Sequence, residues 1–540
     1  MNTTAESAER ALAQAYDTTP YAGDPYCLTH PSLLAAYGCV YGLSPTPPES
    51  CRVLEMGCGD GGNIIPMAYE FPKSEFIGID LSPVQIGFGQ KGVDSLALKN
   101  IRLETRSITD ISAADGTFDY IIVHGVYSWV PDRVKEKILD ICSNNLVGQG
   151  IAYISYNVLP GWQFNKSMRD MMLYRTRHIK DPKERTDAAL DLVKTMLDAT
   201  ADSNRFHDVQ LRFFGKTLQR FPAVSSYLLH DYMEADNDPL YFHEFAGALK
   251  NKGLQYICDA EQTDFELDSL PADAATKFEE VSDNALEVEQ YIDFIKNTRF
   301  RRSLICHESI NVNSDFRLER IEPLFAATDV VPVLDSPESP IEETTAFKMP
   351  GGRQFTTQHS LAQIILRRLS QIKPCTIDIP SLIQAVKKEA LAELAQDSKE
   401  QIDKIGQAVY ALFFNGVVEL LAAPRRCILD PGDYPTASPI SRLLAPSQRV
   451  TNLCHRTIRM DDDMACFVLA HLDGTRNRED LRNLMLENVL TGRVNIPNFK
   501  AGNEEETREL IHNQLESILQ HLPRCGVLMA CAGVDALGGQ

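Results

Sequence analysis

Long apolar runs are absent from this sequence, and none approaches the roughly 18 residues that a membrane-spanning helix needs. The N-terminal stretch MNTTAESAERALAQAYDTTP is polar and lacks the apolar segment of a secretory signal. The 13 cysteines are scattered and form no C-x-x-C pair, which argues against a disulfide framework and against a structural zinc site. These absences predict a cytoplasmic protein that holds no metal and does not insert into a membrane.

Basic residues are also in deficit. Lys and Arg total 53 against 74 Asp and Glu, which leaves a net charge of −21. Such a charge repels a phosphate backbone, so we expect no nucleic-acid partner, and it suits a basic partner such as a protein that presents lysines. Hydrophobic residues make up 44% of the chain, which excludes global disorder, and 540 residues are enough for three or four domains.

Short apolar runs alternate with helical stretches over residues 1–160. Strands are predicted at CRVLEMG, SEFIGID, FDYIIVHG and GIAYISYN, and helices between them at 63–71, 83–98 and 132–146. This alternation predicts βαβ units and a parallel sheet that is covered on both faces. Ligands of such sheets bind beyond the carboxyl ends of the strands.

The rest of the chain divides into further units. Residues 161–332 are largely helical, and residues 333–354 are rich in Pro, Ser, Glu and Gly and are predicted to be a linker. Residues 355–432 carry three amphipathic helices followed by GVVELL and RRCIL, which predict a hairpin and hence a winged-helix-like domain. This unit lacks a basic recognition face, so we expect it to pack against or bind protein rather than DNA. Residues 433–540 are predicted to form a helical domain.

The segment VLEMGCGDGGN is the most informative motif. Gly57, Gly59 and Gly62 fit G-x-G-x-x-G after a strand and before a helix, a pattern that by itself indicates a dinucleotide site. Glu55 stands at the end of the buried strand, where its carboxylate costs desolvation free energy unless a partner satisfies it. The ammonium and sulfonium end of S-adenosylmethionine, or water linked to it, would do so, whereas a pyrophosphate would be repelled. The glycines also fit E-x-G-x-G-x-G with Gly61. These features favour S-adenosylmethionine over NAD.

Asp80 supports the same cofactor. It stands at the tip of the second strand, where its carboxylate can accept hydrogen bonds from both ribose hydroxyls, and Ser82 can cap the helix that follows. The alternative is a glycine turn that binds no nucleotide, in which Glu55 only caps a helix.

Several longer stretches resemble one methyltransferase family. They are YAGDPYCLTHPSLLAAYG, FDYIIVHGVYSWVP, SYNVLPGW, HDYMEADNDPLYFHEFAGALKNKGLQYICDAE, EQYIDFIKNTRFRRSLIC and LAHLDGTRNREDL. The chain resembles class I S-adenosylmethionine-dependent methyltransferases with a methyltransferase regulatory domain, and its layout resembles the rickettsial protein lysine methyltransferases that modify an outer-membrane protein. The resemblance implies an α/β, Rossmann-like domain with a seven-stranded, mostly parallel sheet, followed by a largely helical regulatory domain, a winged-helix-like domain and a helical C-terminal domain.

The resemblance also implies a set of residues that bind the cofactor. They are Glu55, Gly57, Cys58, Gly59, Gly61, Asn63, Asp80, Leu81, Ser107, Ile108 and His124. Glu55 and the glycines are expected at the methionine end, Asp80 at the ribose, and Ser107 with Ile108 near the adenine.

Aromatic residues gather where the methyl acceptor is expected. The predicted acceptor-site residues follow strands four and five and are His124, Tyr127, Trp129, Tyr156, Asn157 and Trp162. They could orient a lysine amine, or they could join the mouth of the sheet to the helical domain, and His124 could be a base or a structural histidine. Tyr16, Tyr21 and His30 are expected to form a lid.

The function predicted from these features is transfer of methyl groups to lysines of a protein substrate, which could be an outer-membrane or surface protein. A small-molecule methyltransferase and a regulatory protein with a degenerate methyltransferase fold are the alternatives. Residues 355–540 are expected to serve the protein substrate, so that their deletion would leave cofactor binding largely intact. The sequence leaves the oligomeric state open, and a homodimer is one candidate.

Overall fold

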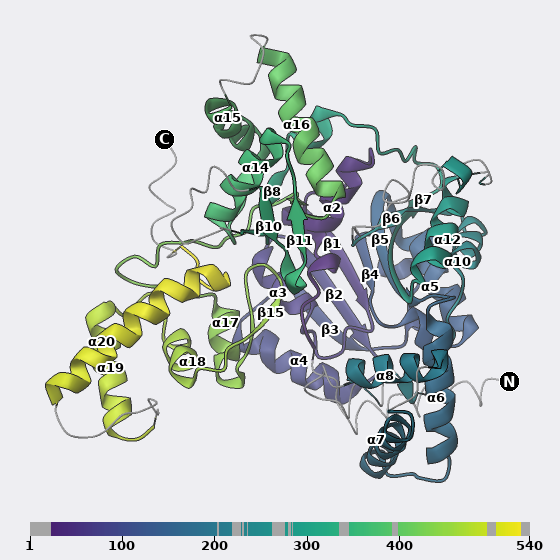
Figure 1. Ribbon diagram of the computed structural model, residues 1–540, viewed down its shortest axis with the longest axis horizontal. Helices are drawn as coiled ribbons and strands as arrows, with labels where there is room; N and C mark the ends of the chain where they lie inside the picture. Colours follow the sequence, from purple (N-terminus) through teal and green to yellow (C-terminus); the bar gives the residue numbers. More distant parts are fainter. Residues whose placement is uncertain are drawn as a thin grey trace.

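The computed structural model describes residues 23–201, 205–218, 228, 232–234, 236–261, 276–278, 282, 284–333, 345–390, 398–493 and 504–530. Two residues of the predicted lid, Tyr16 and Tyr21, lie outside this part of the chain. A central sheet carries three groups of helices around it (Figure 1).

Seven strands form the central sheet. They are β1 (Arg52–Met56), β2 (Glu75–Asp80), β3 (Ile101–Thr105), β4 (Phe118–Val123), β5 (Leu146–Asn157), β6 (Leu254–Asp259) and β7 (Phe300–His307). Their order is β3-β2-β1-β4-β5-β7-β6, with β7 antiparallel to both neighbours and the other pairs parallel. The predicted Rossmann-like, seven-stranded and mostly parallel sheet is confirmed.

Helices cover both faces of this sheet. One face packs against α2 (Pro31–Val40), α3 (Ile64–Glu70) and α4 (Pro83–Ser95), and the other against α5 (Asp132–Asn145) and α10 (Phe242–Lys250). Consecutive strand residues point to opposite faces, so Val53 joins the first core and Leu54 the second. The carboxyl ends of β1, β2 and β4 therefore meet at one edge, where loops are free to build a site.

The middle segment supplies helices and also two strands of the sheet. Its helices are α6 (Trp162–Thr176), α7 (Pro182–Ala199), α8 (Phe206–Leu218), α10 and α12 (Ala285–Lys296). The first three share a separate apolar core that includes Met172 and Phe214. The sequence predicts this segment to be largely helical, yet its strands β6 and β7 complete the sheet of the N-terminal domain, so the sheet ends only at His307.

The winged-helix-like unit contains α14 (Ser360–Ile372), α15 (Ile379–Glu389) and α16 (Ser398–Phe414). Its small sheet has the order β12-β8-β13 and is made of β12 (Ile377–Asp378), β8 (Phe325–Ala327) and β13 (Glu419–Leu421), with α13 (Leu318–Ile321) just before it. The predicted hairpin of GVVELL with RRCIL is therefore wrong: β13 pairs with β8, and Cys427 bridges to Met529 instead. The predicted linker carries strand β10 (Ala346–Lys348), which pairs with β9 (Val331–Pro332) and β11 (Gln354–Thr356).

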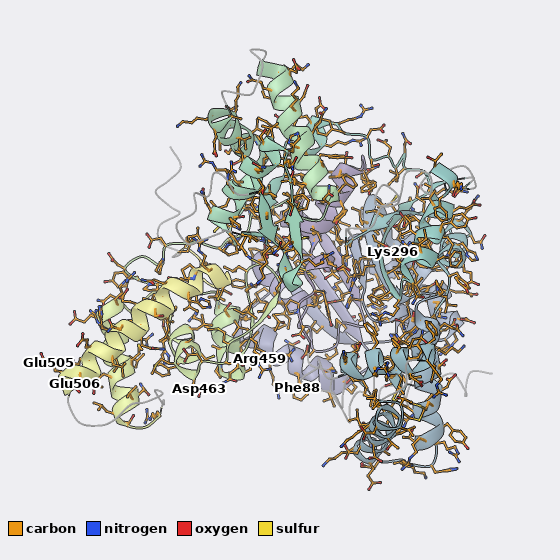
Figure 2. All side chains as sticks on the ribbon, viewed as in Figure 1. Phe88, Lys296, Arg459, Asp463, Glu505 and Glu506 are labelled. Carbon is orange, nitrogen blue, oxygen red and sulfur yellow. The ribbon has the colours of Figure 1, made fainter. Side chains whose placement is uncertain are left out.

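The C-terminal unit is helical with one hairpin. Its elements are α17 (Pro439–Leu444), β14 (Arg449–Thr451), β15 (Thr457–Arg459), α18 (Asp463–Ala470), α19 (Arg478–Leu490) and α20 (Glu504–His521). Glu505 and Glu506 lie at the outer end of α20, away from the sheet (Figure 2). Within the described residues, no helix combines the length and apolarity that crossing a bilayer requires.

Candidate functional site

Glycines shape the loop between β1 and α3. Gly57 has a φ of +78°, a left-handed conformation, and a Cβ atom there would lie 2.5 Å from Cγ2 of Val126. A Cβ atom on Gly62 would lie 2.4 Å from the backbone of Gly23, so this glycine lets the N-terminal segment pass directly over the loop. The side chain of Cys58 is buried in the sheet core, and only its backbone belongs to the loop surface.

Glu55 is the second-last residue of β1 and is almost fully buried, at 3% exposure. Its Oε1 accepts a hydrogen bond from Asn63 Nδ2 at 2.7 Å, whereas its Oε2 has no hydrogen-bond partner among the described residues. Burial raises the pKa of Glu55 from 4.5 to about 8, against the opposing effect of the Asn63 hydrogen bond. An ammonium group placed at Oε2 would both satisfy this atom and favour the ionised carboxylate. The site therefore fits the amino group of S-adenosylmethionine.

Asp80 ends β2 at the same edge and organises the loop. Its Oδ2 accepts from the backbone N–H of Gly59 at 2.9 Å, and its Oδ1 accepts from that of Ser82 at 2.9 Å. Ser82 in turn caps α4 by accepting from the N–H of Gln85 at 3.1 Å, and half-buried Leu81 lies between Asp80 and this cap. Asp80 thus ties the glycine loop to the start of α4, while its contact with the ribose stays a prediction.

Ser107 and Ile108 follow β3 at this edge. Ser107 caps the short 3-10 helix Ile108–Asp110, with its Oγ accepting from the N–H of Thr109 at 3.2 Å. Ile108 packs, partly buried, against the core on the α5 face. Both residues have local structural roles here, and their contact with adenine stays a prediction.

His124 follows β4 and lies beneath the N-terminal segment. Its ring centroid is 3.8 Å from that of Tyr26, and its Nδ1 is 2.9 Å from the hydroxyl oxygen of Tyr153. Burial lowers the pKa of His124 to about 3, and the charge of Arg302 acts in the same direction. A histidine with this pKa is neutral and is a weak base, so the geometry favours an orienting role.

Three of the predicted acceptor residues are buried in cores. Tyr127 and Tyr156 are 4% and 1% exposed, and their ring centroids lie 5.6 and 4.2 Å from that of Phe245 on α10. Trp162 is 5% exposed in the α6–α8 core, and its Nε1 donates to Asn237 Oδ1 at 2.9 Å. Their packing agrees with the alternative in which these aromatics join the sheet to the helical domain.

Trp129 and Asn157 differ from these three. Trp129 ends the short 3-10 helix Tyr127–Trp129 (η5) and is half-buried against the α6–α8 core. Asn157 ends β5, where its backbone N–H donates to Ser128 Oγ at 2.8 Å and its Nδ2 has no partner among the described residues. These two keep groups that the protein does not fully bury or pair, so they are the better candidates for contact with an acceptor.

The segment that precedes α2 covers the glycine loop. The backbone N–H of Gly23 donates to Asp60 Oδ2 at 3.2 Å, and that of Tyr26 donates to Asn63 Oδ1 at 2.8 Å. On the other side of Asn63, His455 Nε2 lies 2.8 Å from the same Oδ1. Sequence reasoning missed Tyr26, Asp60 and His455. Asp60 stands inside the glycine motif and Tyr26 inside a stretch that resembles the family, but no sequence pattern points to His455.

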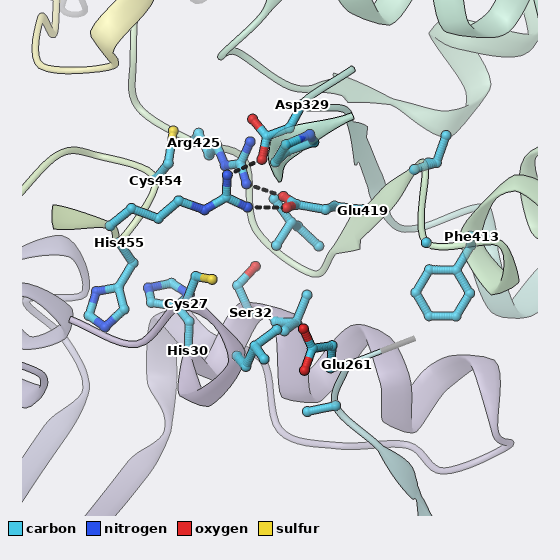
Figure 3. Close-up of a pocket in the computed structure, with 18 of the residues that line it drawn as sticks. Cys27, His30, Ser32, Glu261, Asp329, Phe413, Glu419, Arg425, Cys454 and His455 are labelled. Carbon is cyan, nitrogen blue, oxygen red and sulfur yellow. Dashed lines mark hydrogen bonds and ion pairs between the residues drawn. The ribbon is translucent and has the colours of Figure 1, made fainter. Parts of the chain in front are cut away.

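A cavity of about 380 Å³ lies beside this cover. Figure 3 shows Cys27, His30 and Ser32 on one wall, with Asp329, Glu419 and Arg425 opposite and Cys454 and His455 at one end. Two arginines, Arg425 and Arg456, pair with Glu419, and Arg456 also pairs with Asp329. The cavity is therefore bounded by the N-terminal segment, the winged-helix-like unit and the C-terminal hairpin together.

Three family descriptions match this chain. A methyltransferase domain matches residues 48–208, a predicted methyltransferase regulatory domain matches residues 224–307, and the C-terminal winged helix domain of PKMT matches residues 433–527. The winged-helix match thus lies after the unit for which the sequence predicts a winged-helix-like fold, and it includes the β14–β15 hairpin.

Relatives cover nearly the whole chain. An uncharacterized protein of Rickettsia prowazekii is 32% identical over 511 residues, which is 93% of this chain and 91% of that protein. The solved structure of PKMT2 from Rickettsia typhi has a TM-score of 0.82 and 27% identity, and covers 94% of this chain and 100% of its own. The same protein in complex with AdoHcy has a TM-score of 0.81 and 26% identity, and covers 95% of this chain and 100% of its own.

Proposed function

The chain belongs to the S-adenosylmethionine-dependent methyltransferases that carry a methyltransferase regulatory domain, and from this premise we propose that it methylates lysine side chains of a protein substrate. Its cofactor is S-adenosylmethionine. The observation that carries the lysine proposal is the likeness to PKMT2 over the whole chain, including the units that follow the methyltransferase domain. The resemblance of the sequence to protein lysine methyltransferases supports the same acceptor, and units of this size are easier to explain by a large substrate than by a small one.

Methyl transfer asks the protein mainly to position two reactants and to exclude water. The cofactor supplies a methyl group already activated by its sulfonium. Glu55 would hold the ammonium of the methionine moiety, and the glycine loop with Asp80 would fix the nucleoside. The segment Gly23–Tyr26, which is hydrogen-bonded to Asp60 and Asn63, would limit the access of water to this end of the site.

A lysine acceptor must lose its proton before it attacks. With a reference pKa of about 10.4, presenting the neutral amine at pH 7 costs about 4–5 kcal/mol. Burial of the amine next to a positive sulfonium lowers that cost, because both favour the uncharged form. Neutral His124 adds no positive charge at the sheet edge, and the net charge of −21 attracts a lysine-rich chain. The partner that the family resemblance suggests is an outer-membrane or surface protein.

The product decides the proposal. The purified protein is incubated with isotopically labelled S-adenosylmethionine and a lysate of the organism from which it comes. Labelled protein bands are then analysed by mass spectrometry. We expect the label on lysine side chains, at a rate that rises with pH as more of the amine becomes neutral. The matched control is Glu55→Gln, which keeps the side-chain shape but loses the charge.

Two other results of this experiment would contradict the proposal. Label on glutamine, on carboxylates, on nucleic acid or only on small molecules would contradict the lysine proposal and leave the methyltransferase assignment in place. Binding of AdoHcy without transfer to any acceptor would instead support the regulatory alternative.

A further inference from the structure

The hairpin of β14 and β15 belongs to the C-terminal unit, yet its turn contacts Asn63 of the predicted cofactor site. The turn is held by Asn452, whose Oδ1 accepts from the backbone N–H groups of Cys454 and Arg456, each at 3.0 Å. His455 at the turn has a φ of +54°, a left-handed conformation that costs a residue other than glycine free energy. This conformation goes with a side chain that is directed inward and is only 4% exposed.

The protonation of His455 follows from its neighbours. The backbone N–H of Tyr26 can only donate, so the atom of Asn63 that it contacts at 2.8 Å is the amide oxygen, Oδ1. His455 Nε2 lies 2.8 Å from the same oxygen and must therefore carry the hydrogen. Burial lowers the pKa of His455 well below its ordinary value, and nearby His30 adds to the effect. His455 is thus a neutral donor to Asn63.

Asn63 passes this constraint on to Glu55. With its Oδ1 held by Tyr26 and His455, its Nδ2 faces Glu55 Oε1 at 2.7 Å and donates to it. The other carboxylate oxygen, Oε2, is the buried atom without a partner among the described residues. A chain of two hydrogen bonds therefore connects the C-terminal hairpin to the carboxylate that is predicted to bind the methionine moiety.

The hairpin also holds the cover of the site from outside. Arg449 forms an ion pair with Asp24 at 2.6 Å, and Thr457 donates its hydroxyl to Asp24 Oδ1 at 2.7 Å. Tyr26 forms an antiparallel bridge with Arg456. Figure 3 shows His455 beside His30, where the C-terminal hairpin meets the segment that leads into α2.

We propose that this hairpin is a working part of the cofactor site and that His455 is a positioning residue which, together with the backbone of Tyr26, sets Asn63 and, through it, Glu55. The C-terminal unit then governs the affinity for the cofactor as well as the handling of the substrate. This proposal replaces the expectation from sequence that deletion of residues 355–540 leaves cofactor binding intact. The proposal depends on S-adenosylmethionine being the cofactor, and it does not depend on which acceptor is methylated.

Titration calorimetry of the full-length protein with AdoHcy tests the proposal without any methyl acceptor. We expect His455→Ala to weaken AdoHcy binding roughly tenfold, which is the effect of one lost hydrogen bond in a buried site. His455→Gln keeps a side-chain N–H donor and should recover most of the affinity. The matched control is His471→Ala, a histidine of the same unit whose ring contacts the carbonyl oxygen of Phe467, and it should bind AdoHcy like the wild type.

A double-mutant cycle separates positioning from general loosening. Asn63→Ala with His455→Ala should bind no more weakly than Asn63→Ala alone, because both changes break the same chain of hydrogen bonds. Additive losses, or wild-type affinity in His455→Ala, would overturn the proposal. If His455→Ala does not fold, the isosteric Thr457→Val decides: weaker AdoHcy binding, roughly twofold to fivefold, supports the hairpin's role, and unchanged binding overturns it.

Discussion

Glu55 has a buried carboxyl group, one oxygen of which has no hydrogen-bond partner among the described residues. We expect this combination to make cofactor binding depend on pH. The pKa of Glu55 is raised to about 8 in the folded protein. The protonated form therefore contributes stability to the free protein that is fully present below the unfolded value of 4.5 and is lost as the pH rises through about 8. A bound ammonium group favours the ionised form instead, so binding of the cofactor releases a proton.

We predict that the affinity for AdoHcy rises by up to about tenfold per pH unit between about pH 6 and about pH 8. Calorimetry in buffers of different ionisation enthalpy measures both the affinity and the proton released. Glu55→Gln should bind more weakly and with a nearly flat pH profile. A wild-type profile that is equally flat would show that Glu55 does not ionise on binding.

The two tryptophans of the chain allow a matched comparison. Trp162 is buried with its N–H bonded to Asn237, so Trp162→Ala should lower the free energy of unfolding by about 3–5 kcal/mol. Trp129 is half-buried after β4, so Trp129→Ala should reduce kcat roughly tenfold or more and change AdoHcy affinity little. Urea unfolding and steady-state kinetics measure the two effects. Similar losses of stability in both variants would assign Trp129 to the core as well.

The structure brings the predicted cofactor residues together at one edge of the sheet, whereas it buries three of the predicted acceptor residues in cores. Glu55 and Asn63 belong to the segment that carries the glycine motif, and Asp80 ends the next strand, so the motif and its distance to the next acidic residue were enough to select them. Tyr127, Tyr156 and Trp162 follow the strands as expected, but aromatic residues serve cores and sites alike, and only the packing shows that these three are buried.

At the scale of elements, Arg301 on β7 joins the edge of the sheet to the regulatory segment. The guanidinium is 3% exposed and pairs with Asp259 of β6 at 2.7 Å and with Glu289 and Asp293 of α12, each at 2.9 Å. Removal of this guanidinium leaves three carboxylates without compensation, and one of them, Asp293, is buried. We predict that Arg301→Ala lowers the free energy of unfolding by about 3–5 kcal/mol in urea titrations.

The neighbouring arginine provides the control for this prediction. Arg302 pairs with the more exposed Glu261, so Arg302→Ala should change the free energy of unfolding by less than about 1 kcal/mol. Equal effects of the two substitutions would mean that the cluster around Arg301 contributes no more than a surface ion pair.

Elements were predictable where a strand or helix carries its own signal. The helix that starts at Pro83 was predictable, because Ser82 and Pro83 form a standard N-terminal cap. The strand that pairs with β13 was not predictable from sequence. Proximity along the chain favoured a hairpin with RRCIL, whereas the actual partner, β8, precedes the predicted linker. Strand pairing across such distances depends on the packing of whole units and leaves no local trace.

At the scale of the molecule, the N-terminal segment, the loop that follows β1 of the central sheet and the C-terminal unit meet around Asn63. One residue comes from each of these three parts: the backbone N–H of Tyr26 and the ring of His455 both contact the amide oxygen of Asn63. The composition predicted several domains of ordinary size but could not predict that they share a site, because 392 residues separate Asn63 from His455. Domain boundaries drawn from sequence therefore understate how much the units depend on one another.

The position of β7 has a consequence for how the chain is made. During translation, β1 to β5 leave the ribosome long before β7. The edge of β5 therefore stays unpaired until residues up to His307 have emerged, because Ala152 of β5 pairs with Ile305 of β7. Unpaired edges invite pairing with other chains, and contacts between residues far apart in sequence form slowly. A gene fragment that stops after β5 therefore encodes an unfinished sheet, and a shortened version of the methyltransferase domain should extend through His307.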